Sequence, residues 1–99
     1  MTGAWIYILE CGDGSFYTGL TKQEDPEARA WEHNHRIYKD AYTSSRLPVK
    51  LAYAEYFEMV SDAITAERRI KGWSRAKKIA MMSGNWREVQ VLAKRRGGR

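Results

Sequence analysis

The 99-residue sequence has few of several residue types. Its one cysteine, Cys11, excludes an internal disulfide framework and a cysteine metal cluster, and suits a protein of a reducing compartment. No apolar run approaches the length of a membrane span, and the first residues do not follow the pattern of a secretory signal. These absences argue against a disulfide scaffold and a membrane protein, and they predict a cytoplasmic location.

Acidic residues are scarce in the last third of the chain. Residues 1–67 carry six Lys/Arg against eleven Asp/Glu, whereas residues 68–99 carry eleven Lys/Arg against Glu88 alone. The overall net charge of +5 hides this asymmetry. A basic segment of this kind indicates a polyanionic partner, most simply nucleic acid. The alternative is a solvated basic tail at Lys94 to Arg99.

What the chain does contain suits one folded domain. Its apolar fraction is 43% and its aromatic fraction 12%, both far above those of a disordered segment. We assign residues 1–83 to the main part of the domain, and residues 84–99 to a short helix and basic tail of that same domain. The chain shows no internal repeats.

The expected elements follow a β-β-α-β-α-α order. Strands are predicted at residues 4–10, 15–20 and 49–57, where aromatic and β-branched residues gather. Helices are expected from Pro26 to about His35, from Ser61 to Lys71, and from Ser74 to about Met82, with a short final helix at 86–94. The order predicts an α+β fold with a small three-stranded antiparallel sheet flanked by helices.

The first two strands surround the turn Gly12-Asp13-Gly14, and its length decides where two tyrosines point. A two-residue turn would place Tyr7 and Tyr17 on opposite faces of the sheet. A three-residue loop with Gly14 in a left-handed conformation pairs Tyr7 with Gly19, so that both tyrosines share a face. We predict the three-residue loop, although two aromatic residues on a hairpin are more often core packing than chemistry.

Three more residues are of types that can take part in catalysis. Arg29 and His33 are spaced i,i+4 on the first helix, so a guanidinium that suits phosphate lies beside an imidazole that can exchange protons. The alternative is that Arg29 and His33 are a surface pair on an ordinary amphipathic helix. Glu67 lies on the same helical face as Ala63 and Ile70, which should turn inward.

An inward carboxylate needs a partner. For Glu67 the structural alternative is an ion pair with a nearby arginine, such as Arg29. The chemical alternative is one Mg²⁺ or Mn²⁺ ion, since Mg²⁺ keeps much of its hydration shell and binds jointly to a substrate phosphate.

Taken together, these motifs resemble those of the GIY-YIG nuclease superfamily, and especially its small stand-alone bacterial members. The resemblance covers about residues 4–82 and depends on the joint order and spacing of several motifs. These are Trp5-Ile6-Tyr7, Tyr17-Thr18-Gly19, Arg29-Ala30-Trp31-Glu32-His33-Asn34, Ser45-Arg46-Leu47-Pro48, Ala63-Ile64-Thr65-Ala66-Glu67-Arg68-Arg69-Ile70-Lys71 and Ser74-Arg75-Ala76-Lys77-Lys78. Trp5 replaces a glycine of the first motif, and Thr18 replaces an aliphatic residue of the second.

The resemblance implies metal-dependent hydrolysis of DNA phosphodiester bonds. It makes Tyr7 the candidate general base or water-orienting residue, and His33 a residue that assists Arg29 through a hydrogen bond. Tyr17 would position the phosphate or assist its proton transfers. The sequence leaves open whether Tyr7 or His33 takes the proton. Arg29 would stabilise charge on the phosphoryl group, and Glu67 would hold a single Mg²⁺ or Mn²⁺ ion. The candidate substrate-binding residues are Gly19, Arg46, Lys50, Arg68, Lys71, Arg75, Lys77 and Lys78.

From the resemblance we expect a DNA endonuclease that recognises the structure or the backbone of its substrate, with a role in DNA repair or recombination. One alternative is a catalytically weak module that binds nucleic acid through its basic segment. Another is a catalytic subunit that needs a partner protein or forms a homodimer. RNA instead of DNA as the substrate stays open, because no residue pattern reads a 2′-hydroxyl.

Overall fold

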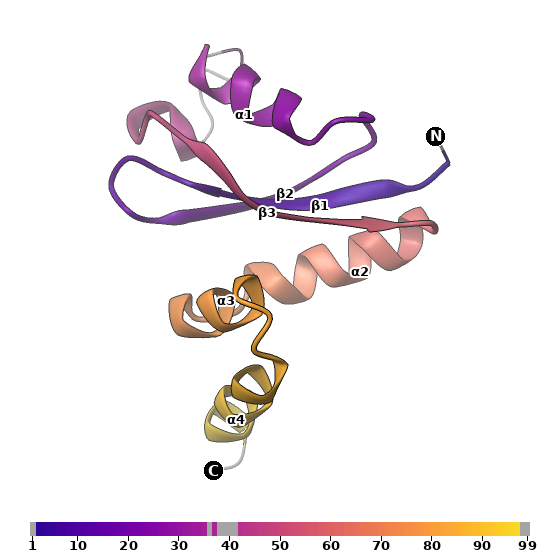
Figure 1. Ribbon diagram of the computed structural model, residues 1–99, viewed down its shortest axis with the longest axis vertical. Helices are drawn as coiled ribbons and strands as arrows, with labels where there is room; N and C mark the ends of the chain where they lie inside the picture. The colour runs from indigo at the N-terminus through magenta and orange to yellow at the C-terminus, as the bar shows by residue number, and fades with distance from the viewer. Residues whose placement is uncertain (1, 36, 38–41, 98–99) are drawn as a thin grey trace.

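The computed structural model describes residues 2–35, 37 and 42–97, with side chains described as far as Leu92 (Figure 1). Three strands form one antiparallel sheet in the order β2-β1-β3. They are β1 (Ala4–Glu10), β2 (Phe16–Thr21) and β3 (Lys50–Phe57). The predicted α+β class and the three-stranded sheet are confirmed.

The register of the first hairpin follows the prediction from its turn. Leu9 pairs with Tyr17, and Tyr7 pairs with Gly19. Gly14 has a φ of 85°, the left-handed conformation that glycine adopts without a side-chain penalty. Asp13 fixes the loop, because its Oδ1 accepts hydrogen bonds from both the backbone N and the hydroxyl of Ser15. The three-residue loop is therefore confirmed.

Four α-helices and one short 3₁₀ segment complete the described chain. They are α1 (Glu27–Asn34), η1 (Tyr42–Ser45), α2 (Val60–Lys71), α3 (Arg75–Met82) and α4 (Trp86–Gly97). The sequence predicts no helix or strand where η1 forms, and it predicts the end of the last helix at residue 94. Ser74 caps α3 as predicted, since its hydroxyl accepts a hydrogen bond from the backbone N of Lys77.

Two predicted helix caps differ from the observed ones. Helix α1 starts after Pro26, which is itself the N-cap, but Asp25 Oδ1 still accepts the Glu27 amide at 2.9 Å. The N-cap of α2 is Met59, two residues before the predicted N-cap Ser61, and it makes no side-chain cap bond. Ser61 therefore lies inside the first turn, because the extended backbone of β3 ends close to Met59 and the helix begins as soon as the chain turns.

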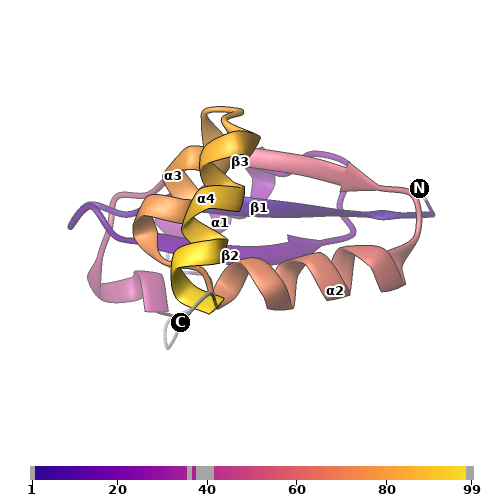
Figure 2. The same ribbon diagram turned by 90° about the horizontal axis from the view of Figure 1, so that it is seen from below.

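The sheet separates two layers (Figure 1). On one face, Ala4, Ile6 and Ile8 of β1 pack against Ala63 and other apolar residues of α2, α3 and α4. On the opposite face, Tyr7, Leu9 and Cys11 pack against Ala30 of α1 and Val49. Figure 2 shows the first layer from below, with α2 lying along the β2 side of the sheet.

Cys11 and Ile79 differ in their burial. Cys11 is buried, and burial raises the pKa of its thiol, which is typical of a packed residue and not a reactive one. Ile79 on α3 is 44% exposed. Within the described part of the chain, no helix is both long enough and apolar enough to cross a membrane.

Candidate active site

Tyr7 lies at the centre of the sheet, directly beside Gly19. The tyrosine is 1% exposed and its ring covers the position that a larger side chain at residue 19 would occupy. A Cβ atom on Gly19 would come within 2.5 Å of the Tyr7 Cζ atom, well inside van der Waals contact. Glycine at this position therefore makes room for the phenol head, as expected from the register.

Tyr17 lies one strand away on the same face. Its ring centroid is 6.4 Å from that of Tyr7 and 5.3 Å from that of His33. Tyr17 is only half-buried, whereas Tyr7 is buried. Of the two phenols, Tyr17 is therefore the one that an incoming substrate can reach more easily.

Arg29 reaches from α1 to the same place. Its Nε donates a hydrogen bond to the Tyr7 hydroxyl at 3.4 Å, and its Nη1 lies 3.1 Å from Glu32 Oε1. The side chains of Arg29 and Glu32 are each 23% exposed, so the guanidinium is held between a phenol and a carboxylate at a partly solvated position. Such a fixed fork suits two phosphate oxygens.

His33 lies deeper, one turn further along α1. It is 3% exposed, and its Nδ1 lies 2.5 Å from the hydroxyl oxygen of Thr43 in η1. Burial lowers the pKa of His33, and the positive charge of Arg29 lowers it further against a smaller opposite effect of Glu32. The imidazole is therefore favoured in its neutral form, which is the form that can accept a proton.

Thr43 was not singled out as the partner of His33 by the sequence, although it is almost completely buried. Ten residues separate the two, and the chain between them has no periodicity that would pair them. The only sequence signal was a short polar stretch at Tyr42 to Ser44. The structure folds that stretch into η1, where Tyr42 stacks on Tyr17 with ring centroids 6.3 Å apart.

Glu67 approaches from the other layer. Its side chain is 14% exposed, between buried Ala63 and buried Ile70, as the helical spacing predicted. Its partner is Lys71 one turn later, with Nζ 2.8 Å from Glu67 Oε2. The suggested ion pair with Arg29 is wrong, because Arg29 pairs with Glu32 on its own helix.

Lys71 connects Glu67 electrostatically to the tyrosine cluster. The hydrogen bond to Glu67 is the main cause that raises the pKa of Lys71, and the Tyr17 phenol contributes in the same direction. Helix α2 packs mainly on β2, the edge strand that carries Tyr17. Glu67 therefore lies in the layer opposite the tyrosines, on the helix that packs against the strand of Tyr17.

The donor set at Glu67 fits one kind of metal site. No group of three or more His, Cys, Asp or Glu residues that could enclose a metal ion occurs among the described residues. Glu67 already holds a cation, the Lys71 ammonium, against its carboxylate. A single carboxylate of this kind fits Mg²⁺ or Mn²⁺ ions that keep water ligands and share a substrate phosphate, and does not fit an all-protein cage.

The remaining predicted binding residues are spread over the surface. Arg46 lies over the Tyr42 ring at 3.9 Å and bonds Asp13 at 3.1 Å, so it links η1 to the hairpin loop. Lys50 is largely exposed and lies 3.5 Å from Glu10. Arg68 is exposed on α2. Arg46 is connected to Tyr17 through the Tyr42 ring, which stacks on Tyr17.

Helix α3 divides its basic residues between two environments. The guanidinium carbon of Arg75 lies 4.5 Å from the Phe16 ring centroid. Arg75 and Lys78 line one pocket together with Ser15 and Phe16. Lys77 is 8% exposed and its ammonium lies 4.2 Å from the Trp73 ring centroid. In this conformation Lys77 is not accessible to a phosphate, so it takes no part in the interface proposed below.

The chain is similar to known proteins over most of its length. Residues 3–80 match the model of the GIY-YIG catalytic domain. A UPF0213 protein of Syntrophus aciditrophicus is 41% identical over 85 residues, which cover 86% of this chain and 95% of that protein. A UPF0213 protein of Staphylococcus saprophyticus is 44% identical over 79 residues, covering 80% and 93%.

A solved structure shares both sequence and fold. The solution NMR structure of a UPF0213 protein from Bacillus halodurans is 38% identical, with a TM-score of 0.53 over 82% of this chain and 83% of that one. The domain match and these relatives lead to one assignment. The chain belongs to the GIY-YIG nuclease family, together with its small bacterial UPF0213 members.

Proposed function

We propose that the protein is a metal-dependent endonuclease that hydrolyses DNA phosphodiester bonds. The observation that carries this proposal is the contact between Arg29 and Tyr7 beside Tyr17, on a face where Gly19 leaves no side chain in the way. Membership of the GIY-YIG family supports a nuclease-like role. A cytoplasmic location and a role in DNA repair or recombination are part of the same proposal.

In this proposal each residue has a distinct task. Arg29 binds the phosphoryl oxygens and stabilises the charge that develops on them, which is the largest single contribution expected of one such group. Tyr17, the more accessible phenol, positions the phosphate. The Tyr7 hydroxyl accepts a hydrogen bond from Arg29, so it is held in one orientation toward the reacting water.

His33 and Tyr7 are the two candidates for the general base. Because burial and Arg29 favour neutral His33, the imidazole is ready to accept a proton near neutral pH. Thr43 fixes the orientation of that ring through its short contact to Nδ1. Glu67 would hold the divalent ion, which supplies Lewis acidity to the departing oxygen.

The test is cleavage of labelled single-stranded, duplex, flapped and branched DNA with Mg²⁺ or Mn²⁺. We expect wild-type protein to cut at least one substrate and Glu67→Gln to lose cutting while it still binds DNA. Asp62→Asn, which removes a carboxylate from an exposed position on the same helix, is the matched control and should cut normally. Cutting that survives in Glu67→Gln would contradict the metal assignment.

A second candidate function is binding of nucleic acid without cutting. The eleven Lys/Arg residues of segment 68–99 favour it, because phosphate neutralisation alone gives salt-dependent affinity. If no substrate is cut and binding weakens steeply with salt, this candidate replaces the nuclease. A homodimer or a partner protein that completes the site is a variant of the nuclease proposal.

A further inference from the structure

A small basic pocket lies next to the candidate active site. It has a volume of about 230 Å³ and is lined by Ser15, Phe16, Arg75 and Lys78. The pocket therefore joins the hairpin end of β2 to the first turns of α3. In Figure 1 this is the end of the sheet where the β1–β2 loop lies, with α3 below it.

Arg75 is fixed at the wall of this pocket. Its Nη1 donates to the backbone carbonyl oxygen of Gly14, and its guanidinium carbon lies 4.5 Å from the Phe16 ring centroid. These two contacts use one of its five N–H groups and one face. Within the described part of the chain no carboxylate lies within 4 Å of Arg75, so its charge is not neutralised by an ion pair.

Lys78 adds a second positive charge to the pocket. It is half-buried, and both its burial and the nearby Lys71 lower the pKa of its ammonium group. No ion pair joins Lys78 to a carboxylate among the residues that the structure describes. Two cations without an ion-pair partner at one surface pocket create a positive potential there that attracts an anion.

The pocket and the tyrosine cluster are adjacent across one strand. Phe16 and Tyr17 are consecutive in β2, so their side chains leave on opposite faces, one into the pocket and one into the candidate active site. Lys71 interacts electrostatically with both Tyr17 and Lys78. A polyanion that lies across the β2 edge therefore meets both places.

The hydroxyl of Ser15 is already used in another contact. It donates to Asp13 Oδ1 at 2.6 Å, so it forms part of the wall and is not a donor for a ligand. The donors available to an anion are therefore those of Arg75 and Lys78. A guanidinium beside an ammonium is a pattern that suits a phosphate group.

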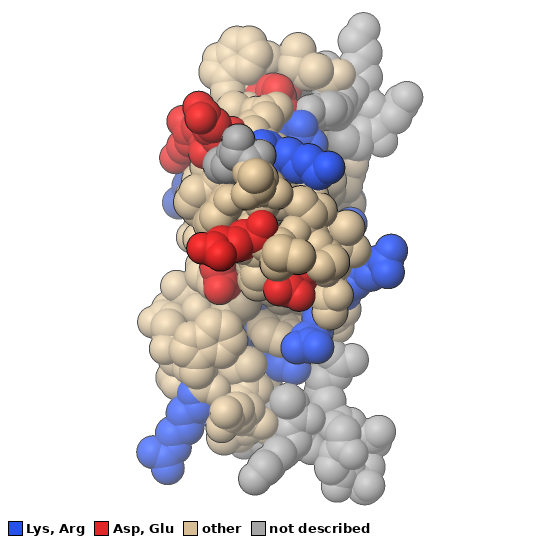
Figure 3. Space-filling model, turned by 90° about the vertical axis from the view of Figure 1, so that its right-hand side faces the viewer, with Lys and Arg blue, Asp and Glu red and all other residues tan. Residues whose placement is uncertain are grey.

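We propose that this pocket binds a phosphate group of the substrate strand other than the one that is cleaved, so that the strand passes the site on the hairpin side. The inference rests on the proposed function for the identity of the substrate. On the end of the molecule away from the hairpin, Figure 3 shows acidic side chains interspersed with Lys and Arg side chains, and no exclusively basic surface among the described residues.

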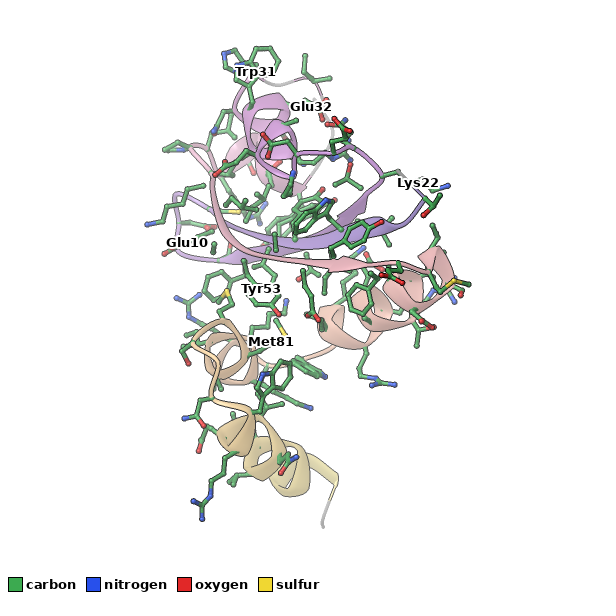
Figure 4. The ribbon with its side chains drawn as sticks, turned by 45° about the vertical axis from the view of Figure 1, so that its right-hand side comes forward. Glu10, Lys22, Trp31, Glu32, Tyr53 and Met81 are labelled. Carbon is green, nitrogen blue, oxygen red and sulfur yellow. The ribbon has the colours of Figure 1, made fainter. Side chains whose placement is uncertain are left out.

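The first test uses inorganic phosphate as the probe, followed by amide chemical shifts. We expect saturable shifts at Ser15, Phe16 and Arg75 in the wild-type protein. Lys78→Gln should weaken binding about tenfold, the effect of one lost charge-assisted hydrogen bond. Lys22→Gln removes the same charge beyond the far end of β2 and should leave binding unchanged (Figure 4).

Two results of this titration would contradict the proposal that the pocket binds phosphate. One is an equal loss of affinity in Lys78→Gln and Lys22→Gln, which would mean that phosphate responds only to total charge. The other is a set of shifts that lies elsewhere on the surface. If Lys78→Gln does not fold, Arg75→Gln provides the second variant, because Arg75 is exposed and its contacts are to a loop carbonyl and one ring face.

The second test uses a short DNA oligonucleotide and separates the pocket from the chemistry. Without metal, the dissociation constant should rise about tenfold in Lys78→Gln and stay constant in Lys22→Gln. With metal, KM should rise by the same factor while kcat stays constant. A fall in kcat with unchanged KM would contradict the proposal. If the protein does not cut at all, the proposed function fails, and the two binding experiments still decide the pocket.

Discussion

The two faces of the sheet carry different kinds of side chain. The face under α2, α3 and α4 presents Ala4, Ile6 and Ile8, all fully buried and all apolar. The face under α1 presents Tyr7 with Arg29 and His33 close by, so polar groups replace much of the apolar packing. One strand, β1, supplies both sets through simple alternation. The comparison indicates that the apolar core is concentrated on one face, whereas the tyrosines, Arg29 and His33 lie on the other, with Glu67 of α2 as the one candidate residue from the first layer.

Figure 4 shows the same division in side chains. Trp31 and Glu32 of α1 lie above the sheet, whereas Tyr53 of β3 and Met81 of α3 lie below it. Trp31 is 57% exposed and stacks on His35 with ring centroids 3.9 Å apart, so the outer side of α1 adds little core. Met81 is 2% exposed within the apolar cluster.

The largest expected effect on stability comes from the apolar face. Ile8→Ala removes a fully buried side chain and should reduce the free energy of unfolding by about 2–5 kcal/mol. Chemical denaturation measures this loss. Cleavage by the fraction that remains folded should be unchanged, because Ile8 points away from the tyrosines. A large loss of cleavage without a loss of stability would mean that the two faces are not separate.

Gly19→Ala is expected to have a smaller effect on stability and a direct effect on the site. The added methyl group would press on the Tyr7 ring, and overpacking of this kind destabilises by about 1–3 kcal/mol. Because Tyr7 must move, cleavage should fall as well. Gly72→Ala is the matched control, since the nearest atom outside its own neighbours lies 3.6 Å from the added Cβ. Equal behaviour of the two variants would contradict the close approach.

The smallest expected effect is on the pH dependence of stability. The pKa of His33 is below its ordinary value of 6.5 in the folded protein, so the unfolded chain binds the proton more readily. The stabilising contribution of neutral His33 is complete above the ordinary value, and it is lost as the pH falls from there through the lowered pKa of the folded protein. Between pH 7 and pH 5, the midpoint temperature of thermal unfolding should therefore fall more in the wild type than in His33→Gln.

The control for that comparison is His35→Gln, at an exposed position just beyond α1. Its decline with pH should match that of the wild type. Thr43→Val tests the partner of the imidazole and should reduce the free energy of unfolding by about 1–3 kcal/mol through the lost buried hydrogen bond. If His33→Gln and the wild type decline in parallel, the lowered pKa is wrong.

The sequence predicted those parts of the site that depend on local rules. The glycine at position 14 decided the register, and the register brought Tyr7 and Tyr17 to one face. Helical spacing placed Arg29 beside His33 and turned Glu67 inward. Each of these predictions needed only the periodicity of one element or one turn.

Parts of the structure that depend on contacts across the chain were not predictable in this way. The partner of His33 comes from η1, which forms in a segment without a clear pattern. For Glu67 the local partner Lys71 prevails over the distant Arg29, because a pair one turn apart needs no alignment of separate helices. The burial of Lys77 against Trp73 likewise depends on how α3 folds back on the chain.

One measurement tests the difference between the faces most directly, because each face has a half-buried tyrosine. Tyr17 belongs to the candidate active site, whereas Tyr53 packs on the apolar cluster and donates its hydroxyl to Glu55 Oε1 at 2.8 Å. The measurement is single-turnover DNA cleavage with Mg²⁺ by Tyr17→Phe and by Tyr53→Phe, which remove the same atom from opposite faces. We predict a loss of about 10²-fold or more in Tyr17→Phe and no loss in Tyr53→Phe. Equal rates in the two variants would contradict the assignment of the chemistry to the α1 face.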